Sequence, residues 1–360
     1  MTTAFVLSGG GSLGAVQVGM LRALAERHVT PDLLVGTSAG ALNAVFVAAH
    51  GMSPASLDRL AATWTALRRD DVFPLRAPRM VLALAGARNA LCAGTGLERL
   101  VRRHVAVQGL EDTPIPVHLV ATDLLSGEEV LLSEGDPVSA VLASSAIPAV
   151  LPAVERDGRT LVDGGLADNT AISQAAALGA DRIYVLPTGY ACALPAPPSR
   201  PLAVAVQALS LLVQRRLITD VALYADRVDL VVLPPLCPLR IAATDFRHAA
   251  ELIRRSHASA AGWLDSGAAS CPRPERILGM HGHPARAAGQ ASLSPGSAVP
   301  GSTPRSVAAS SSSVVASSAH AEQPERCAGI AASSAAAGCV PRASSVRPAG
   351  SAPPASKAST

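Results

Sequence analysis

Short apolar runs alternate with longer amphipathic stretches up to about residue 270. Apolar runs that end in glycine, proline or polar residues are typical of buried strands, whereas apolar residues three and four positions apart indicate helices. This pattern predicts strands at 4–7, 32–37, 117–123, 128–132, 159–162, 182–187 and 229–233, and helices at 15–28, 39–50, 53–68, 95–104, 137–144, 171–178, 202–225 and 246–264. Their alternation predicts an α/β fold with a mainly parallel sheet.

One apolar segment, residues 80–85, is flanked by arginines in the stretch LRRDDVFPLRAPRMVLALAGARNALCA (67–93). An apolar segment between arginines suits contact with an anionic lipid surface. The same residues also suit a helix over 80–91 that faces the core. We favour the core-facing helix.

The composition changes near the end of this patterned region. Residues 281–360 consist mainly of Ala, Ser, Pro and Gly, with very few large apolar side chains. Such a segment buries too little apolar surface to offset the entropy lost on ordering. We therefore predict a globular domain over 1–272, with its motifs at 4–190 and a helical remainder at 191–272, followed by a disordered tail over 273–360.

Charge and cysteine usage exclude several classes of protein. Six basic residues and two glutamates fall in 281–360, so +4 of charge lies there and the rest of the chain carries −1 of the net +3. The folded part therefore gives no argument for nucleic acid as a partner. The six cysteines show no CxxC pair, and no His, Cys, Asp and Glu cluster has metal-ligand spacing, so we expect thiols, no metal and no cofactor.

The N-terminal stretch MTTAFVLSGGGSLG has no basic start and too short an apolar run for a signal peptide. No apolar run approaches the ~20 residues needed to span a bilayer. We therefore expect a cytoplasmic protein.

Residues 9–14, GGGSLG, satisfy the G-x-G-x-x-G pattern between a predicted strand and a predicted helix. A dinucleotide site would also need an acidic residue about 20 positions later, at the carboxyl end of the second strand. Asp32 has that spacing but precedes its strand, which places it at the wrong edge of the sheet. The dinucleotide interpretation is therefore disfavoured.

A second glycine motif, GTSAG at 36–40, places Ser38 where a strand turns into a helix. A serine at such a turn sits in strained backbone with its side chain exposed, and Gly36 and Gly40 remove side chains that would collide there. The helix that follows directs its N-terminal N–H groups at the site. Ser38 is then either a helix-capping residue in a crowded turn or a nucleophile.

Two other features favour the nucleophile. The glycines at 9–11 supply unobstructed amides that suit a developing oxyanion. A later strand ends in Asp163-Gly164-Gly165, which makes Asp163 the best-framed candidate for the base that a serine nucleophile needs.

Five stretches together resemble the patatin-like phospholipase family: GGGSLGAVQVGML, GTSAGALNA, ASSAIPAVLPAV (143–154), DGGLADNTAI (163–172) and LGADRIYVLPTG (178–189). The resemblance covers about residues 4–190 and implies a three-layer α/β/α fold. It implies that Ser38 is the nucleophile and Asp163 its dyad partner, with Gly164 and Gly165 in the aspartate loop. The glycine loop of the oxyanion hole would comprise Gly9, Gly10, Gly11 and Gly14, with the amide of Ser12 as a further donor.

The glycine loop departs from the family pattern at one position. The family usually has Arg or Lys before the last glycine, where this chain has Leu13. A backbone oxyanion hole does not require that cation. Its loss puts in doubt the orientation of the loop and any preference for a phosphorylated head group.

Histidines offer an alternative triad, because His248 and His257 follow Asp163 in the chain order of α/β-hydrolases. Both lie in an arginine-bearing helical pattern, so we favour a solvated face. His118 is interpreted as a sheet histidine with a satisfied hydrogen bond. Asp123 and Asn169 are interpreted as turn residues, with a supporting role in the site as the alternative for each.

The sequence therefore predicts a lipid acyl hydrolase that cleaves carboxylic esters of phospholipids or related lipids through a Ser38–Asp163 dyad and an acyl-enzyme. Its expected partners are the lipid substrate and, transiently, a membrane surface. Two alternatives stay open: a catalytically silent lipid-binding protein of the same fold, and a dinucleotide-binding domain that uses GGGSLG.

Overall fold

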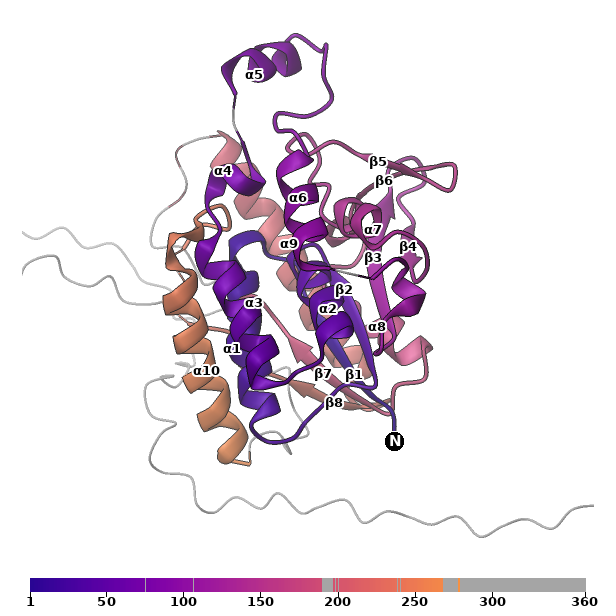
Figure 1. Cartoon of the computed structure of the whole chain (residues 1–360), viewed down its shortest axis with the longest axis vertical. Coiled ribbons are helices and arrows are strands. Elements are labelled where there is room, and N and C mark those ends of the chain that lie inside the picture. The colour runs from indigo at the N-terminus through magenta and orange to yellow at the C-terminus, as the bar shows by residue number, and fades with distance from the viewer. Residues whose placement is uncertain are drawn as a thin grey trace, which may run out of the picture. The chain divides into compact units, whose positions relative to one another are not determined.

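The computed structural model describes residues 1–74, 76–105, 107–189, 197, 199, 201–237, 239, 241–267 and 278. These residues contain an eight-stranded sheet in the order β5-β6-β3-β2-β1-β7-β8, with β4 also paired to β3 (Figure 1). The strands are β1 (Thr3–Leu7), β2 (Leu33–Thr37), β3 (Val117–Asp123), β4 (Glu129–Leu132), β5 (Val154–Arg156), β6 (Arg159–Asp163), β7 (Arg182–Leu186) and β8 (Asp229–Val232). Strands β1, β2, β3, β7 and β8 pair in parallel, whereas β4, β5 and β6 join in antiparallel fashion.

The helices follow the predicted pattern closely. The longer ones are α1 (Gly14–Ala25), α2 (Ala39–His50), α3 (Pro54–Ala66), α5 (Ala77–Leu84), α6 (Thr95–His104), α7 (Pro137–Ser144), α9 (Pro201–Tyr224) and α10 (Ala249–Asp265). The shorter ones are α4 (Arg69–Val72), α8 (Ile172–Ala177) and the 3₁₀ turns η1 (Gly11–Leu13), η2 (Leu110–Asp112), η3 (Gly164–Leu166) and η4 (Phe246–His248). The predicted start of α3 is confirmed, because Ser53 caps it by accepting a hydrogen bond from the Ser56 N–H at 3.2 Å.

Alternation along the strands divides the core between the two faces of the sheet. In β1, Phe5 and Leu7 belong to one apolar cluster, whereas Ala4 and Val6 belong to another, as the two-residue period of a strand requires. The first cluster includes buried residues of α1, α2, α3 and α10, and the second includes those of α8 and α9. Figure 1 shows α1, α3 and α10 side by side on their face. The predicted α/β fold with a mainly parallel sheet is confirmed, with helical layers on both faces.

Strand β5 is missing from the sequence-based prediction. It is three residues long, lies at the end of the sheet and pairs with β6 through the turn at Asp157-Gly158, where both residues have positive φ. An Asp-Gly pair between short strands is a strong hairpin signal. That dipeptide could have identified the hairpin.

The prediction of a core-facing helix over residues 80–91 is wrong. Helix α5 ends at Leu84, and no residue of it with a described side chain is buried. Val81 is 65% exposed and Leu82 is 45% exposed. An eight-residue helix flanked by arginines offers too narrow an apolar stripe to compete for the core face that α1, α2, α3 and α10 already cover.

A compact unit runs from Met1 to Ala285 and contains all of the described residues. Within it, Leu278 is fully buried in the cluster beneath α8 and α9, and its carbonyl oxygen accepts a hydrogen bond from Gln214 Nε2 at 2.8 Å. The predicted boundary at 272 is therefore too early, because Leu278 lies beyond it and packs with the domain. The rest of the predicted tail lies outside the described residues and stays a prediction.

Among the helices that the structure describes, none combines the length and the apolar character that a bilayer crossing requires.

Candidate active site

Ser38 occupies the turn between β2 and α2. Its backbone is strained, with φ 54° and ψ −118°, a combination that L-residues adopt only where surrounding structure imposes it. Two glycines make the turn possible. A Cβ on Gly36 would lie 2.7 Å from the Gly40 carbonyl oxygen, and one on Gly40 would collide with the Leu7 carbonyl. The sequence-based placement of Ser38 at a strand-to-helix turn is confirmed.

Sheet register brings Ser38 to Asp163. Thr37 of β2 is aligned with Val120 of β3, and the next residue of β3, Ala121, is aligned with Asp163 of β6. Ser38 and Asp163 therefore lie on either side of β3 at the same level. The Ser38 Oγ donates a hydrogen bond to Asp163 Oδ2 at 2.8 Å, and both side chains are largely buried.

Asp163 is poised to exchange a proton near neutral pH. Burial raises the pKa of its carboxyl group to about 6, while hydrogen bonds from the Gly165 N–H and from Ser38 Oγ oppose the rise. Above that pH the carboxylate, which can accept a proton, is the prevailing form. The geometry and the pKa are those that a general base in hydrogen-bond contact with a hydroxyl requires.

Ser144, at the end of α7, holds the backbone of this turn, and sequence reasoning missed it. Its hydroxyl donates to the Val120 carbonyl oxygen at 2.6 Å and accepts from the Ser38 N–H at 2.9 Å. Ser144 is fully buried. Because its hydroxyl is committed to both partners, it ties the strained Ser38 amide to β3.

The glycine loop lies against Ser38. A Cβ on Gly9 would come within 3.1 Å of Ser38 Cβ, and Gly11, with φ 57°, lines the same cavity as Ser38. Several of its amides are already engaged: the Gly9 N–H donates to Asn169 O, the Ser12 N–H donates to Ala243 O at 2.7 Å, and the Leu13 N–H donates to Gly10 O.

These hydrogen bonds leave fewer backbone N–H groups in the loop that could bind an oxyanion. The Ser12 amide is not free for that role, and the Gly14 amide donates within the turn that begins α1. Among the described residues, no acceptor is paired with the N–H of Gly10 or Gly11. These two amides are therefore the candidates for binding a developing oxyanion.

Thr188, directly after β7, orients the first of these amides and was also missed. Its Oγ1 donates to the Gly9 carbonyl oxygen at 2.6 Å, and Asn169 Nδ2 makes a longer contact of 3.4 Å with the same oxygen. Because a trans peptide is planar, fixing the Gly9 carbonyl directs the Gly10 N–H the opposite way. A Cβ on Gly10 would collide with Thr188. Asn169 thus contacts the glycine loop, which agrees with the alternative interpretation that it supports the site.

A buried polar network anchors both ends of the loop. Gln17 Nε2 donates to the carbonyls of Ser8 and Leu186, both at 2.9 Å. Asn43 Nδ2 donates to Gly14 O and to Gln17 Oε1, and its Oδ1 accepts from Trp64 Nε1 at 2.8 Å. Gln17 and Asn43 are fully buried, so each bond is costly to break. The glycine loop is therefore rigidly positioned.

An apolar cavity opens beside Ser38. It has a free volume of about 40 Å³. Apart from Gly11, Ser38 and Ser145, its lining is apolar: Ala39, Leu42, Trp64, Leu67, Val72, Phe73, Leu97, Leu100, Ile147, Leu151 and Phe246. Leu13, at the position where the family usually has a cation, is half-buried against the main core.

The histidines predicted as unlikely catalytic partners are bonded elsewhere. His257 Nε2 lies 2.8 Å from Glu26 Oε1, and His248 lies beside Asp245 and Glu251. His118 of β3 bonds Ser133 Oγ at 2.7 Å, which confirms it as a satisfied sheet histidine. Neither Ser38 nor Asp163 has a histidine partner among the described residues.

The other acidic candidates have structural roles. Asp32 precedes β2 and accepts from the Thr3 N–H at 2.7 Å, at the opposite end of the strand from Ser38. This position agrees with the argument against a dinucleotide site. Asp123 accepts from the Leu125 N–H at 2.9 Å and lies near Arg159, as expected of a turn residue.

The arrangement defines an α/β protein with a serine at a strained strand–helix turn, whose hydroxyl group is hydrogen-bonded, among the described residues, to the Asp163 carboxylate alone. Residues 5–176 match the model of the family described as patatin-like phospholipase.

Curated relatives are similar to about half of this chain. An uncharacterised NTE family protein of Mycobacterium tuberculosis is 34% identical over 179 residues, which make up 49% of this chain and 46% of that protein. Patatin-like phospholipase domain-containing protein 7 of Rattus norvegicus is 29% identical over 189 residues, 52% of this chain and 13% of that protein. The chain thus matches less than half of the length of these relatives.

Among solved structures, VipD from Legionella pneumophila aligns with 74% of this chain and 67% of its own, with a TM-score of 0.40 and 16% identity.

Proposed function

We propose that this chain is a lipid acyl hydrolase that cleaves carboxylic esters through a Ser38–Asp163 dyad. The observation that carries the proposal is the 2.8 Å hydrogen bond from Ser38 Oγ to the buried Asp163 carboxylate, beside a rigid glycine loop. The match of residues 5–176 to the patatin-like phospholipase family model supports a lipid as the substrate.

The reaction begins when Ser38 Oγ attacks the ester carbonyl carbon and its proton passes to Asp163 Oδ2. The carbonyl oxygen becomes an oxyanion, which the amides of Gly10 and Gly11 bind. As the intermediate collapses, the ester C–O bond breaks and Asp163 returns the proton to the leaving alcohol. An acyl-enzyme remains on Ser38.

Water completes the cycle. Asp163 takes a proton from a water molecule, which attacks the acyl carbon, and the same two amides bind the second oxyanion. Collapse of this intermediate breaks the bond to Ser38 Oγ, which regains its proton from Asp163. The products are the alcohol and a free carboxylic acid, and the enzyme returns to its starting protonation state.

The apolar cavity beside Ser38 supports an acyl chain as the group transferred to the serine. Apart from Ser38, Ser145 and Trp64, whose Nε1 is bonded to Asn43, its side chains carry no hydrogen-bonding group that could select a polar acid. Its volume of about 40 Å³ is far below the range of roughly 300–1,000 Å³ that is typical of ligand sites. A long chain therefore requires the surrounding side chains to shift, and short-chain esters should react without that shift.

Helix α5 supports contact with a membrane surface. It begins four residues after Phe73, which lines the cavity, and it exposes Val81 and Leu82 near Arg76 and Arg79. Apolar side chains next to arginines suit the boundary between anionic head groups and acyl chains. The helix would hold the cavity near the lipid from which the substrate comes.

Fluorophosphonate labelling of the full chain tests the proposed nucleophile. We expect stoichiometric labelling at Ser38 and hydrolysis of a short-chain p-nitrophenyl ester, with both lost in Ser38→Ala. The alanine variant should stay folded because Ala is smaller than Ser in the same turn. Absence of labelling in folded wild-type protein would instead favour a catalytically silent lipid-binding protein. Retention of most of the esterase rate in Ser38→Ala would place the nucleophile elsewhere.

A further inference from the structure

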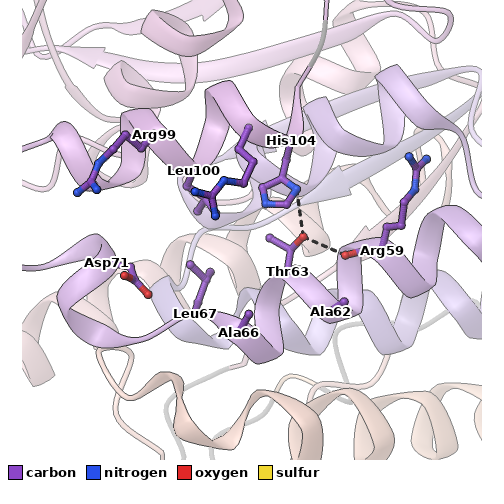
Figure 2. Close-up of a pocket in the computed structure, with 11 residues that line it drawn as sticks. Arg59, Ala62, Thr63, Ala66, Leu67, Asp71, Arg99, Leu100 and His104 are labelled. Atoms are coloured by element: carbon purple, nitrogen blue, oxygen red, sulfur yellow. Dashed lines mark hydrogen bonds between the residues drawn. The ribbon is translucent and has the colours of Figure 1, made fainter.

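A second and larger cavity lies between α3 and α6, outside the proposed catalytic site. Its volume is about 470 Å³, within the range of about 300–1,000 Å³ that is typical of ligand sites. Figure 2 shows Arg59 and His104 toward one end, and Arg99 and Asp71 toward the other. The lining residues are Arg59, Ala62, Thr63, Ala66, Leu67, Asp71, Gly96, Arg99, Leu100, Arg103 and His104. We call this cavity the α3–α6 cleft.

The cations of the α3–α6 cleft lack anionic partners. Within the described parts of the chain, Arg59, Arg99 and Arg103 form no ion pair. The acidic neighbours on the same two helices are taken, because Asp58 pairs with Arg22 and Glu98 pairs with Arg102.

The one carboxylate that lines the cleft does not offset these cations. Asp71 accepts a hydrogen bond from the Arg68 N–H at 2.8 Å, which caps α4. It lies toward the Arg99 end, away from Arg59 and His104 (Figure 2). The end of the cleft near Arg59 and His104 therefore carries unbalanced positive charge.

Hydrogen-bonding groups and apolar surface adjoin this charge. Thr63 Oγ1 donates its proton to the Arg59 carbonyl oxygen at 2.9 Å and lies 3.4 Å from His104 Nδ1, so of these two side chains the His104 imidazole is the one that can donate to an anion. Further along, Ala62, Ala66, Leu67 and Leu100 provide apolar lining. Leu67 and Leu100 also line the cavity beside Ser38, so they form a wall between the two cavities.

We propose that the α3–α6 cleft binds a single-chain anionic amphiphile. Arg59 and Arg103 hold its phosphate or carboxylate head group, and its chain lies along Leu67 and Leu100. Arginine suits this role because its planar guanidinium donates two parallel hydrogen bonds to such oxygens. Binding here is independent of the chemistry proposed for Ser38. The bound chain would lie one layer of side chains from the proposed acyl cavity.

Isothermal titration calorimetry with dodecyl phosphate, as monomer below its micelle concentration, tests this site on the full chain. Dodecyl phosphate has no carboxylic ester, so the proposed hydrolysis cannot consume it. We expect saturable binding that weakens at least about tenfold in Arg59→Gln/Arg103→Gln, since charge-assisted hydrogen bonds contribute about 1.5–3 kcal/mol each and 1.4 kcal/mol is tenfold.

Arg102→Gln is the matched control, because Arg102 lies on α6 beside Arg103 but pairs with Glu98 and does not line the cleft. It should bind dodecyl phosphate within about twofold of wild type. Ala62→Trp places a large side chain at an exposed lining position, and should abolish binding while circular dichroism stays unchanged.

Control ligands distinguish the contribution of the head group from that of the chain, and binding of a monomer from binding to a membrane. Inorganic phosphate and dodecyl maltoside should each bind far more weakly than dodecyl phosphate, and phosphatidic acid vesicles should compete no better than the monomer. Equal affinity in the arginine double variant and wild type would overturn the proposal. The proposal would also be overturned if dodecyl maltoside or inorganic phosphate bound as tightly as dodecyl phosphate, or if the vesicles bound in preference to the monomer.

Discussion

At the scale of single residues, the proposed chemistry depends on groups whose neighbours limit what they can do. Asp163 is held by the Gly165 N–H and by Ser38 Oγ in a buried setting that raises its pKa to about 6. The Gly10 amide is directed by the Gly9 carbonyl, which Thr188 holds. One substitution at Asp163 and one at Thr188 distinguish a role in the chemistry from a structural role.

Asp163→Asn should lower turnover by several orders of magnitude, because the amide cannot accept the Ser38 proton. Wild-type turnover should rise with pH through about 6, as the carboxyl group ionises. A carboxyl pKa that is raised on folding makes the folded state lose stability as pH rises through it. Asp163→Asn should therefore be more stable than wild type at pH 8, by roughly 1–3 kcal/mol. Rates on a p-nitrophenyl ester and urea denaturation at pH 5 and pH 8 measure both effects.

Two histidine variants complete this experiment. His248→Gln and His257→Gln should keep nearly the full rate, because both side chains bond to carboxylates away from Ser38. An inactive histidine variant beside an active Asp163→Asn variant would replace the dyad with a triad.

Thr188→Val should lower kcat about 10- to 100-fold with little change in KM. Valine keeps the shape of threonine but cannot donate to the Gly9 carbonyl, so the Gly10 amide loses its fixed direction. Thr170→Val is the control: its Oγ1 has no hydrogen-bond partner in the part of the chain that the structure describes, so its removal should leave kcat unchanged. Steady-state kinetics on one ester decide the matter, and equal kcat in Thr188→Val and wild type would remove Thr188 from the positioning role.

At the scale of elements, each helix is placed by the apolar surface it can bury. Helix α2 is buried on nearly every side and fits against the sheet because small residues such as Ala41 and Ala44 let it approach. Helix α5 has arginines and large exposed apolar residues but no described buried side chain. A helix of this kind is available for an external surface, which is the basis for proposing lipid contact there.

Leu82→Asp should weaken binding to phosphatidylglycerol vesicles roughly tenfold, since a charge replaces an apolar side chain at the proposed interface. Leu223→Asp on α9 is a matched control, because Leu223 is 46% exposed and Leu82 is 45% exposed. Vesicle sedimentation measures both variants. Equal binding by Leu82→Asp and wild type, or equal loss in both variants, would contradict a specific role for α5.

At the scale of the whole molecule, the domain extends past the change in composition. Leu278 is buried under α8 and α9, and Gln214 of α9 binds its carbonyl oxygen. The compact unit runs to Ala285. Residues 286–360 are poor in large apolar side chains, so the composition predicts that they add little to the stability of the domain.

Truncation after Ala285 should therefore leave the melting temperature and the esterase rate nearly unchanged. Truncation after Pro272 removes Leu278 and should cost about 1.5–3 kcal/mol, the usual contribution of a buried leucine. Leu278→Ala in the full chain should cost about 2–5 kcal/mol. Differential scanning calorimetry of the three proteins compares them directly, and a large loss on truncation after Ala285 would show that residues beyond it pack against the domain.

The sequence by itself determined the local elements and the position of the strained turn. Periodicity placed β1, β2, β3, β7 and β8 to within a few residues, and Gly36 and Gly40 marked the turn at Ser38, because strand length, helix spacing and crowding at a turn are local properties. The family resemblance pointed to Asp163 as the partner of Ser38.

Only the tertiary structure decided how distant groups meet. The antiparallel pairing of β6 with β3 sets Asp163 level with Ser38, and no periodicity in the chain encodes the register between strands this far apart. The same holds for Ser144, Thr188 and the pairing of the Ser12 amide with Ala243, which depend on side chains and carbonyls more than 100 residues away. Whether an apolar side chain is buried also depends on which other elements pack against it. For that reason only the tertiary structure showed that α5 is exposed and that Leu278 is buried.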